Sequence, residues 1–263
     1  MILDDIFKNR AIQVARQKER LPFAEIEHRA FEFAAGHKAN NFAAALKKDS
    51  VSIIAEVKKA SPSKGLICKD FDPVKIAGRY QAAGAAAISV LTEESYFQGS
   101  GAYLEAIRAK VELPLLRKDF IFDEWQLCEA RLLGADAVLL IAAMLEPKEL
   151  KRLYEFAISL GMQVLVETHN EDEIEEAKAA GAQIFGVNNR NLFDFTVDLC
   201  CAERLSKLLP KDSVFVAESG IFDRADVVRM RDAGADAVLV GESLMRAPSI
   251  EQKIIELSVT KND

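Results

Sequence analysis

Short apolar runs recur along the chain, and several of them end in charged or amide residues. Each run is too apolar to alternate between a buried and an exposed face, which predicts strands buried on both faces. The runs are VSIIAEVK, PLLRK, MQVLVET, IFGVNN and VFVAES, and their polar ends include Lys58, Lys118, Glu167, Asn188, Glu218 and Ser219. In a barrel of parallel strands, functional side chains gather at this carboxyl end of the strands.

Five glycines mark the junction between an apolar helix end and the next strand. They lie in AAGAAAISVL (82–91), LLGADAVLLI (132–141), SLGMQVLVET (159–168), AAGAQIFGVN (179–188) and DAGADAVLVG (232–241). A glycine in this position predicts a left-handed helix cap, followed by a short link to the strand. Repeated strand–helix units of this kind indicate a parallel sheet.

The number of such units predicts the fold. Eight strands are expected, at 51–58, 85–91, 114–118, 137–141, 162–167, 184–188, 214–218 and 237–240. Helix starts fall between them, and the cap signals are Asp72-Pro73, Asp123 with Gln126, Glu146-Pro147 and Asn170 with Glu173. Eight units in this length match an α/β fold, the (β/α)8 or TIM barrel. A doubly wound open sheet is the alternative, but no G-x-G-x-x-G follows the first strand.

The first fifty residues precede the barrel pattern. Residues 2–19 place apolar side chains at helical spacing, and residues 24–35 and 40–48 are interpreted as further helical pieces. Their apolar faces need a partner, and no Gly/Ser-rich linker separates them from the rest of the chain. We therefore expect residues 1–48 to form an N-terminal helical extension packed on the barrel, within a single domain over residues 1–263.

The segment after the first strand is long for a connection between a strand and a helix. Residues 59–72 contain Pro and Gly together with three lysines. Long loops at the catalytic end of a barrel often serve as lids or binding loops. A mobile, cationic loop is therefore expected here.

The composition of the chain argues against several classes of protein. The 263 residues carry a net charge of −7, which argues against a nucleic-acid partner, since such binding relies on Lys and Arg at the phosphates. No apolar stretch is long enough to span a membrane, and the acidic start MILDDIFKNR is unlike a signal peptide, so a cytoplasmic protein is expected. The four cysteines form no C-x-x-C pair and the three histidines are scattered, so neither a disulfide framework nor a metal site is expected.

Glycines at the ends of the last two strands predict an anion site. ESG (218–220) and VGES (240–243) each place a glycine where a strand turns toward a helix. Backbone N–H groups can approach an anion closely there, and a short helix after the last strand would direct its positive end to the same point. Gly220 and Gly241, with Ser61 from the first loop, therefore predict a phosphate site. A tight turn that requires glycine for its backbone angles is the alternative.

Charged residues at the strand ends predict acid–base chemistry. The set comprises Glu56, Lys58, Lys118, Glu167, Asn188 and Glu218. Carboxyl groups placed among ammonium groups in a partly dry cavity acquire separated proton affinities. Such a set can both donate and accept protons near neutral pH. A solvated ring of salt bridges is the alternative, although burying so many charges without a function costs free energy.

Neighbouring residues indicate how a substrate is held. Arg190 suits a carboxylate, with an ion pair at the rim as the alternative. Phe120, Phe122 and Trp125 suit the wall of an aromatic-binding site, although packing of the following helix is the more common use of such residues. His169 is interpreted as a loop residue, with catalysis as the minor option.

In this order, these residues resemble the indole-3-glycerol phosphate synthases of tryptophan biosynthesis. The segments that carry the resemblance are IAEVKKASPSKG (54–65), LTEESYFQGS (91–100), LLRKDF (115–120), LVETH (165–169), GVNNRNL (186–192), ESGI (218–221) and VGESLM (240–245). The resemblance spans nearly the whole chain and implies a lyase that uses neither cofactor nor metal. The implied substrate is a phosphorylated small molecule, 1-(2-carboxyphenylamino)-1-deoxyribulose 5-phosphate. The implied products are indole-3-glycerol phosphate, carbon dioxide and water.

The resemblance also implies residue roles. Lys118 would protonate the carbonyl oxygen during ring closure, and Lys58 would hold the carboxylate and later help the hydroxyl leave. The implied catalytic residues are Glu56, Lys58, Lys118, Glu167, Asn188 and Ser219. The implied substrate contacts are Ser61, Phe120, Arg190, Glu218, Gly220, Gly241 and Glu242.

Two other readings remain open from the residues themselves. Another phosphosugar barrel, such as phosphoribosylanthranilate isomerase or the tryptophan synthase α subunit, would share the phosphate-binding ends. An isomerase, however, needs one acid–base pair rather than two lysines and two acids. A non-catalytic phosphate sensor or assembly partner would not need proton donors at both ends of its ligand. The sequence does not specify an oligomeric state, and a monomer is favoured.

Overall fold

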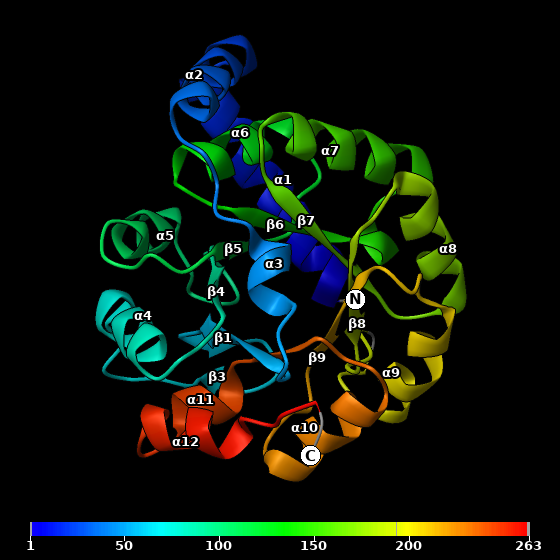
Figure 1. The fold of residues 1–263 in the computed structure, drawn as a ribbon. Helices are drawn as coiled ribbons and strands as arrows, with labels where there is room; N and C mark the ends of the chain where they lie inside the picture. Colours follow the sequence, from blue (N-terminus) through cyan, green and yellow to red (C-terminus); the bar gives the residue numbers. More distant parts are fainter. Residues whose placement is uncertain (1, 193, 262–263) are drawn as a thin grey trace.

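Residues 2–192 and 194–261, which the computed structural model describes, fold into a closed barrel of eight parallel strands surrounded by helices (Figure 1). The outermost positions of the predicted 1–263 domain, residues 1 and 262–263, lie outside the described residues. The strands pair in the order β1–β10–β9–β8–β7–β6–β5–β4, so order around the barrel follows order along the chain. The barrel strands are β1 (Ser52–Val57), β4 (Ala87–Leu91), β5 (Leu115–Lys118), β6 (Ala137–Ile141), β7 (Gln163–Thr168), β8 (Ile184–Asn188), β9 (Val214–Glu218) and β10 (Ala237–Val240).

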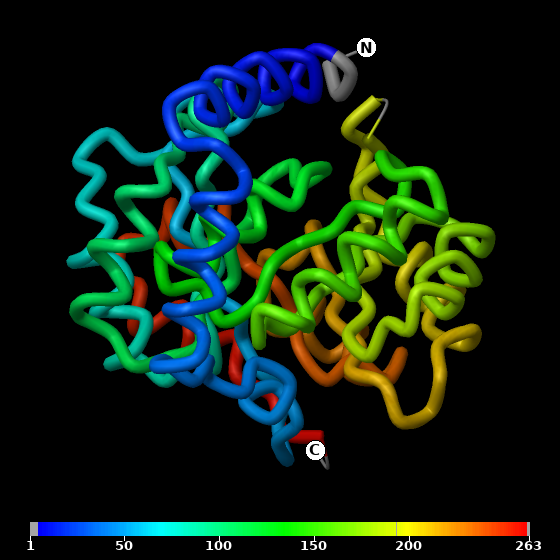
Figure 2. Tube along the Cα trace, turned by 90° about the horizontal axis from the view of Figure 1, so that it is seen from above, coloured from blue at the N-terminus to red at the C-terminus, as the bar shows by residue number. Residues whose placement is uncertain are grey.

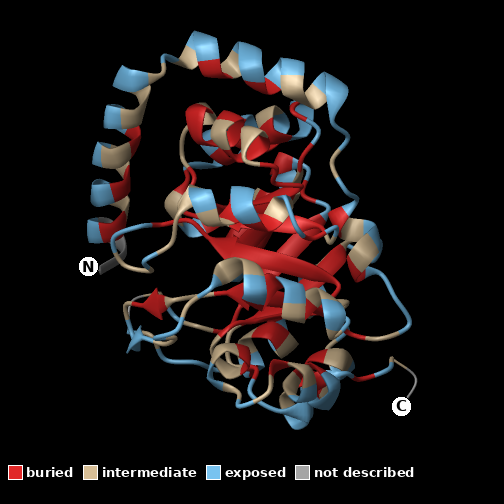
Figure 3. Ribbon diagram, turned by 90° about the vertical axis from the view of Figure 1, so that its left-hand side faces the viewer, coloured by how far each residue is buried: buried red, intermediate tan, exposed pale blue. Residues whose placement is uncertain are grey.

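The predicted barrel is confirmed, and each strand boundary lies within two residues of its predicted position. The strands are apolar along most of their length because the sheet separates two hydrophobic clusters. One cluster fills the barrel and includes Leu116, Leu165 and Val216. The other lies between the sheet and the helices and includes Val90 and Val138. Figure 3 shows the result, a buried sheet inside helices whose outer faces are exposed.

The five glycines predicted to end helices all have left-handed backbone conformations. Their φ angles lie between 78° and 92°, at Gly84, Gly134, Gly161, Gly181 and Gly234. Side chains with a Cβ atom rarely adopt these angles, so glycine lets each helix stop and the chain turn into the next strand.

The helices around the barrel begin where the cap signals predict. Asp72 accepts a hydrogen bond from the backbone N–H of Lys75, and Asp123 forms a reciprocal capping box with Gln126. The helices are α4 (Pro73–Ala82), α5 (Gly101–Arg108), α6 (Glu124–Leu132), α7 (Pro147–Ser159), α8 (Glu171–Ala180), α9 (Cys200–Leu205), α10 (Arg224–Asp232), α11 (Glu242–Arg246) and α12 (Ile250–Leu257), with 3-10 turns η1 (Ala142–Met144) and η2 (Ser206–Leu208). None of the described helices combines the length and hydrophobicity that a membrane crossing requires.

The N-terminal extension reaches both ends of the barrel. It consists of α1 (Ile2–Arg20), α2 (Phe23–Gly36) and α3 (Phe42–Leu46). Figure 2 shows α1 lying across one end of the barrel and α3 near the opposite end. Ile6 of α1 lines the cavity at the carboxyl ends of the strands, whereas Phe42 and Leu46 of α3 join the cluster inside the barrel. The extension is therefore built into both the cavity and the core.

A buried ion pair anchors α1. Arg10 donates to both carboxylate oxygens of Asp119, at 3.1 and 2.8 Å, and the whole Arg10 residue is only 2% exposed. Asp119 also accepts hydrogen bonds from Thr92 Oγ1 at 2.7 Å and Arg117 Nη2 at 3.0 Å. Burial opposes the carboxylate charge, but Arg117 and Arg10 outweigh it and lower the pKa of Asp119. Arg117 and Asp119 flank Lys118, so the attachment of α1 and the position of Lys118 depend on one network.

The segment 59–72 is more ordered than a simple loop. β2 (Ala60–Ser61) pairs antiparallel with β3 (Gly65–Leu66), and the backbone N–H groups of Ile67 and Cys68 donate to the carbonyl of Lys59. Ser61 and its neighbours on this hairpin line the cavity. The predicted long, cationic connection therefore carries a small hairpin at the mouth of the barrel.

We predict that Arg10→Ala lowers the free energy of unfolding by about 3–5 kcal/mol, because it leaves Asp119 and its partners buried with one cation fewer. Urea denaturation followed by circular dichroism measures this change. Arg16→Ala is the matched control, since Arg16 lies on the same helix and is exposed. A loss for Arg10→Ala no larger than that for Arg16→Ala would contradict the anchoring role.

Candidate active site

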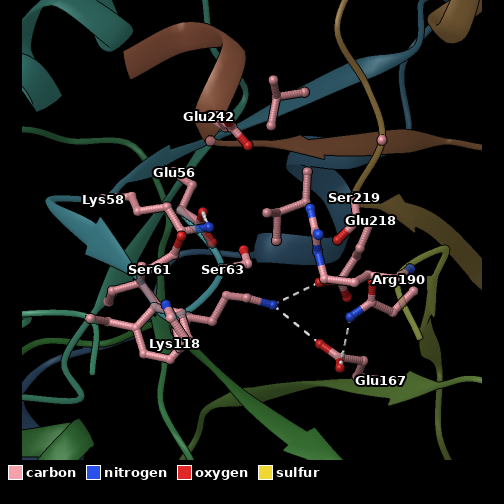
Figure 4. Close-up of a pocket in the computed structure, with 18 of the residues that line it drawn as sticks. Glu56, Lys58, Ser61, Ser63, Lys118, Glu167, Arg190, Glu218, Ser219 and Glu242 are labelled. Atoms are coloured by element: carbon pink, nitrogen blue, oxygen red, sulfur yellow. Dashed lines mark hydrogen bonds and ion pairs between the residues drawn. The ribbon is translucent and has the colours of Figure 1, made fainter. Parts of the chain in front are cut away.

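One cavity opens at the carboxyl ends of the barrel strands, and it gathers side chains from distant parts of the sequence (Figure 4). All thirteen residues predicted for the site line it, namely Glu56, Lys58, Ser61, Lys118, Phe120, Glu167, Asn188, Arg190, Glu218, Ser219, Gly220, Gly241 and Glu242. Their convergence follows from the barrel, because parallel strands present their carboxyl ends at the same rim. The roles of the individual residues remain predictions.

Lys118 lies between two carboxylates. Its Nζ is 2.7 Å from Glu218 Oε2 and 3.2 Å from Glu167 Oε2, and both carboxylates are buried. Figure 4 shows Lys118 reaching across the cavity toward them. Burial opposes the ammonium charge, but Glu218, Glu167 and Glu56 outweigh it and raise the pKa of Lys118. The ammonium is therefore charged across the physiological pH range.

The pKa values of the two carboxylates that share Lys118 are shifted in opposite directions. Burial alone would raise both pKa values. For Glu167, Lys118, His169 and the hydrogen bond from Asn188 outweigh burial and lower the pKa. For Glu218, burial and the charge of Glu167 prevail over Lys118 and raise the pKa to about 7. Glu167 is thus ionised throughout the neutral pH range, whereas Glu218 gains and loses a proton near neutral pH.

A second ion pair lies on β1. Lys58 Nζ is 2.7 Å from Glu56 Oε2, as the two-residue spacing along a strand predicts. Glu56 Oε1 and Glu218 Oε1 are buried and accept no hydrogen bond among the described residues. Buried polar atoms are nearly always hydrogen-bonded, so these oxygens are available to a proton or to a ligand donor.

Asn188 is the last residue of β8, and Arg190 lies two positions further on. Asn188 Nδ2 donates to Glu167 Oε1 at 3.0 Å, and Asn188 Oδ1 accepts the backbone N–H of Arg190 at 3.0 Å. Arg190 Nη1 donates to the carbonyl of Phe195 at 3.1 Å. Asn188 therefore orients the carboxylate of Glu167, and the guanidinium of Arg190 is held at the mouth by the loop that follows.

The glycines of the site allow tight turns and also leave space for neighbouring side chains. Gly220 has φ +80°, the conformation that favours glycine. A Cβ atom on Gly241 would meet Glu56 Oε2, and one on Gly186 would meet Glu218 Oε1. Gly186 was not predicted, although a glycine inside a strand is a sign of a close approach at that point.

Gly241 is also the residue before α11, so the predicted short helix after the last strand is present. The carboxylate of Glu242 accepts a hydrogen bond from Arg246 Nε at 3.0 Å, so this side chain is engaged within the helix. Gly220, the start of α11 and Ser61 all border the same cavity. This is the part of the rim where barrels bind phosphate.

Among the described residues, four phenylalanines line the cavity, and three of them, Phe97, Phe195 and Phe222, were not predicted from the sequence. Phe120 and Phe97 both line it, with ring centroids 6.1 Å apart. Phe97 is held by a loop in which the buried Glu93 accepts backbone N–H groups from Ser95, Tyr96 and Phe97. The loop is preorganised by one carboxylate, which no local sequence pattern specified.

Phe122 and Trp125 serve the extension rather than the cavity. Phe122 packs on Phe7 with ring centroids 4.7 Å apart, and Trp125 Nε1 donates to the carbonyl of Leu21 at 2.8 Å. Neither Phe122 nor Trp125 is among the residues that line the cavity, so the packing alternative applies to them. The described residues include no group of three or more His, Cys, Asp or Glu side chains arranged to hold a metal ion.

The fold and the site together define a (β/α)8-barrel enzyme with acid–base groups in a cavity at the carboxyl ends of its strands. Residues 3–257 match the family model for indole-3-glycerol phosphate synthase, and the chain belongs to this family. The family predicted from the sequence is therefore confirmed, and with it a carboxy-lyase of tryptophan biosynthesis. This membership favours the lyase over the isomerase and the non-catalytic sensor.

Relatives of the chain agree with the family. The chain is 46% identical over 263 residues to the indole-3-glycerol phosphate synthase of Aliarcobacter butzleri, with 100% of both chains covered. It is 49% identical over 257 residues to that of Acetivibrio thermocellus, covering 97% of this chain and 98% of the relative. A solved structure of 3-hexulose-6-phosphate synthase has a TM-score of 0.61 and covers 79% of this chain and 98% of that one. At 16% identity this likeness concerns the fold alone.

We predict that Gly186→Ala lowers kcat by about a hundredfold, because the added methyl displaces the carboxylate of Glu218 from Lys118. Steady-state kinetics with the family's substrate measures the effect. Gly78→Ala on α4 is the matched control, since a Cβ atom there meets nothing within 4 Å. Equal kcat values for the two variants would show that the space beside Gly186 is not needed.

We predict that Glu218→Gln stabilises the folded chain more at pH 8.5 than at pH 5.5. The folded pKa of Glu218 is raised to about 7, so its protonated form favours folding below its unfolded pKa, and that stability is lost as the pH rises through about 7. The gain from the substitution at high pH is at most on the order of 3 kcal/mol. Chemical denaturation at the two pH values measures it, and a pH-independent difference would contradict the raised pKa.

Proposed function

We propose that this chain converts 1-(2-carboxyphenylamino)-1-deoxyribulose 5-phosphate to indole-3-glycerol phosphate, carbon dioxide and water in the cavity at the barrel rim. The observation that carries the proposal is the ammonium of Lys118, held between Glu167 and Glu218 and opposite the Glu56–Lys58 pair. Proton donors and acceptors thus face the cavity from two sides. Ring closure followed by dehydration needs both, whereas binding alone needs neither.

The cavity has a place for each part of this substrate. The phosphate binds beside Gly220, Gly241 and the start of α11, with the hydroxyl of Ser61 completing the contact. The aromatic ring lies against Phe120 and Phe97. The carboxylate of the substrate pairs with a cation at the mouth of the cavity. Lys58 and Arg190 are the cations placed to do so.

Lys118 acts in the first step. The ring carbon that bears the carboxylate attacks the ribulose carbonyl, and negative charge develops on the carbonyl oxygen. Lys118 stabilises this charge and gives the oxygen a proton, which leaves a hydroxyl on the new ring. The bond to the carboxylate then breaks, carbon dioxide departs, and its electron pair restores the aromatic ring.

Dehydration needs a donor and a base. Lys58, paired with Glu56, gives a proton to the departing hydroxyl, which leaves as water. A carboxylate removes the proton from the carbon beside the nitrogen and so completes the indole. Glu167 is available for this role because it is ionised at neutral pH and is held in place by Asn188. Glu218, whose pKa is about 7, returns the proton to Lys118.

The proposal extends to the cellular location, the oligomeric state and the partners of the protein. We infer that it acts in the cytoplasm as a monomer and without a nucleic-acid partner. The net charge of −7 supports the last point, because it disfavours binding to phosphate backbones. Gel filtration with light scattering, performed with and without substrate, tests the oligomeric state.

We predict that the wild-type chain produces indole fluorescence from the carboxyphenylamino substrate and that Lys118→Ala lowers turnover by about 10²–10⁴-fold. The fold is expected to survive, because Lys118 is a rim residue outside both apolar clusters. Fluorescence-monitored kinetics and thermal unfolding measure the two properties separately.

Lys110→Ala is the matched control, since Lys110 is exposed and follows α5 on the outside of the barrel. Its turnover should equal that of the wild type. The proposed reaction fails if the wild-type chain yields no indole product. The role of Lys118 fails if its alanine variant melts earlier yet keeps normal turnover per folded molecule.

A further inference from the structure

His169 lies directly behind Glu167, outside the cavity. Glu167 is the second-last residue of β7, and His169 is the first residue after the strand, which ends at Thr168. Nε2 of His169 is 3.3 Å from Glu167 Oε1, and the imidazole is only 14% exposed. His169 is not among the described residues that line the cavity, so it reaches the substrate only through Glu167.

A second carboxylate holds the other side of the imidazole. Glu173, in the first turn of α8, has Oε2 3.1 Å from His169 Nδ1, and the same oxygen accepts the backbone N–H of His169 at 2.7 Å. Glu173 Oε1 accepts a hydrogen bond from Asn170 Nδ2 at 2.6 Å. Glu173 is therefore fixed at the start of its helix and fixes both the ring and the main chain of His169.

Carboxylates on both ring nitrogens favour the charged imidazolium. A neutral imidazole carries a proton on only one nitrogen, so it would leave one carboxylate facing a lone pair. Burial opposes the charge, but Glu167 and Glu173 outweigh it and raise the pKa of His169 to about 10. Nε2 makes no well-aligned hydrogen bond, so its effect on Glu167 is exerted through charge at 3.3 Å.

Every group that faces the imidazole is consistent with this charge. Glu167 faces it from β7 and Glu173 from α8, and Lys118 lies beyond Glu167. From α9, Cys201 Sγ donates to the carbonyl of His169 at 3.7 Å. Burial raises the pKa of the Cys201 thiol, so this neighbour stays neutral.

The position of this charge matters because Lys118 serves two carboxylates. When Lys118 transfers its proton, Glu167 loses its nearest cation. We propose that His169, held by Glu173, is a positioning residue that carries a permanent positive charge. This charge keeps Glu167 ionised and in place while Lys118 transfers its proton. This inference rests on the proposed roles of Lys118 and Glu167.

The test is the pH profile of His169→Gln. Without the imidazolium, the pKa of Glu167 rises, so the acidic limb of kcat/KM moves to higher pH by about one unit or more, and turnover recovers as the pH increases. kcat should fall more than KM changes, because His169 does not touch the substrate. A merely structural role would lower activity equally at all pH values, and an unshifted acidic limb would overturn the inference.

Glu173→Gln removes the clamp and should shift the limb in the same direction by a smaller amount. Asp172→Asn is the matched control, because it removes one acid from the same helix turn without a contact to His169. Its profile should match that of the wild type. A shift for Asp172→Asn as large as that for Glu173→Gln would overturn the specific contact.

A second measurement does not depend on activity. The chain has three histidines, so NMR of protein labelled with ¹⁵N-histidine resolves His169 by its loss in His169→Gln. The imidazolium of His169 should persist above pH 8. Titration near the ordinary value of about 6.5 would overturn the inference even if the enzyme is active. A persistent imidazolium in a chain without synthase turnover would uphold the charge placement and refute the proposed function instead.

Discussion

The properties of the site follow from a deficit of positive charge beside the carboxylates that are buried at the mouth of the barrel. Glu56, Glu167 and Glu218 are almost completely buried, and Lys118 is shared by two of them. A buried carboxylate without a full counter-charge binds a proton more tightly. One ammonium cannot fully compensate two neighbours, so Glu167 stays ionised while the pKa of Glu218 rises to about 7. The capacity for proton transfer near neutral pH follows from this imbalance.

The surrounding strands fix the positions of these carboxylates and of Lys118. Gly186 and Gly241 leave space on neighbouring strands that the carboxylates of Glu218 and Glu56 occupy. On the outer side of β5, Arg117 is fully buried and donates to Thr92, Asp119 and Glu129, so the strand cannot rotate without breaking those contacts. Side chains alternate across a strand, and a fixed Arg117 on one face therefore fixes where Lys118 points on the other. The position of the ammonium is thus set in part by the contacts that Arg117 makes on the opposite face of β5.

The sequence predicted those features that repeat or that act over a few residues. Strands buried on both faces are mostly apolar, and left-handed helix ends favour glycine, so the eight strands and five helix caps could be located to within two residues. The convergence of the strand-end charges followed from the barrel itself. Contacts between distant segments were not predicted. Arg10 and Asp119 are 109 residues apart, and no pattern in either segment specifies the other. His169 lies in the connection between β7 and α8, as interpreted, but its contacts with Glu167 and Glu173 were not predicted.

The extension is better understood as part of the catalytic structure than as an addition to a complete barrel. A barrel alone would leave its core uncovered at the amino ends of the strands, where Phe42 and Leu46 complete the interior cluster. At the carboxyl ends, Ile6 contributes to the cavity wall, and Arg10 neutralises the residue that follows Lys118. Because one helical segment covers both ends, folding of the extension and assembly of the site are coupled through the same buried residues. The buried Arg10–Asp119 pair therefore links the position of α1 to the strand end that carries Lys118.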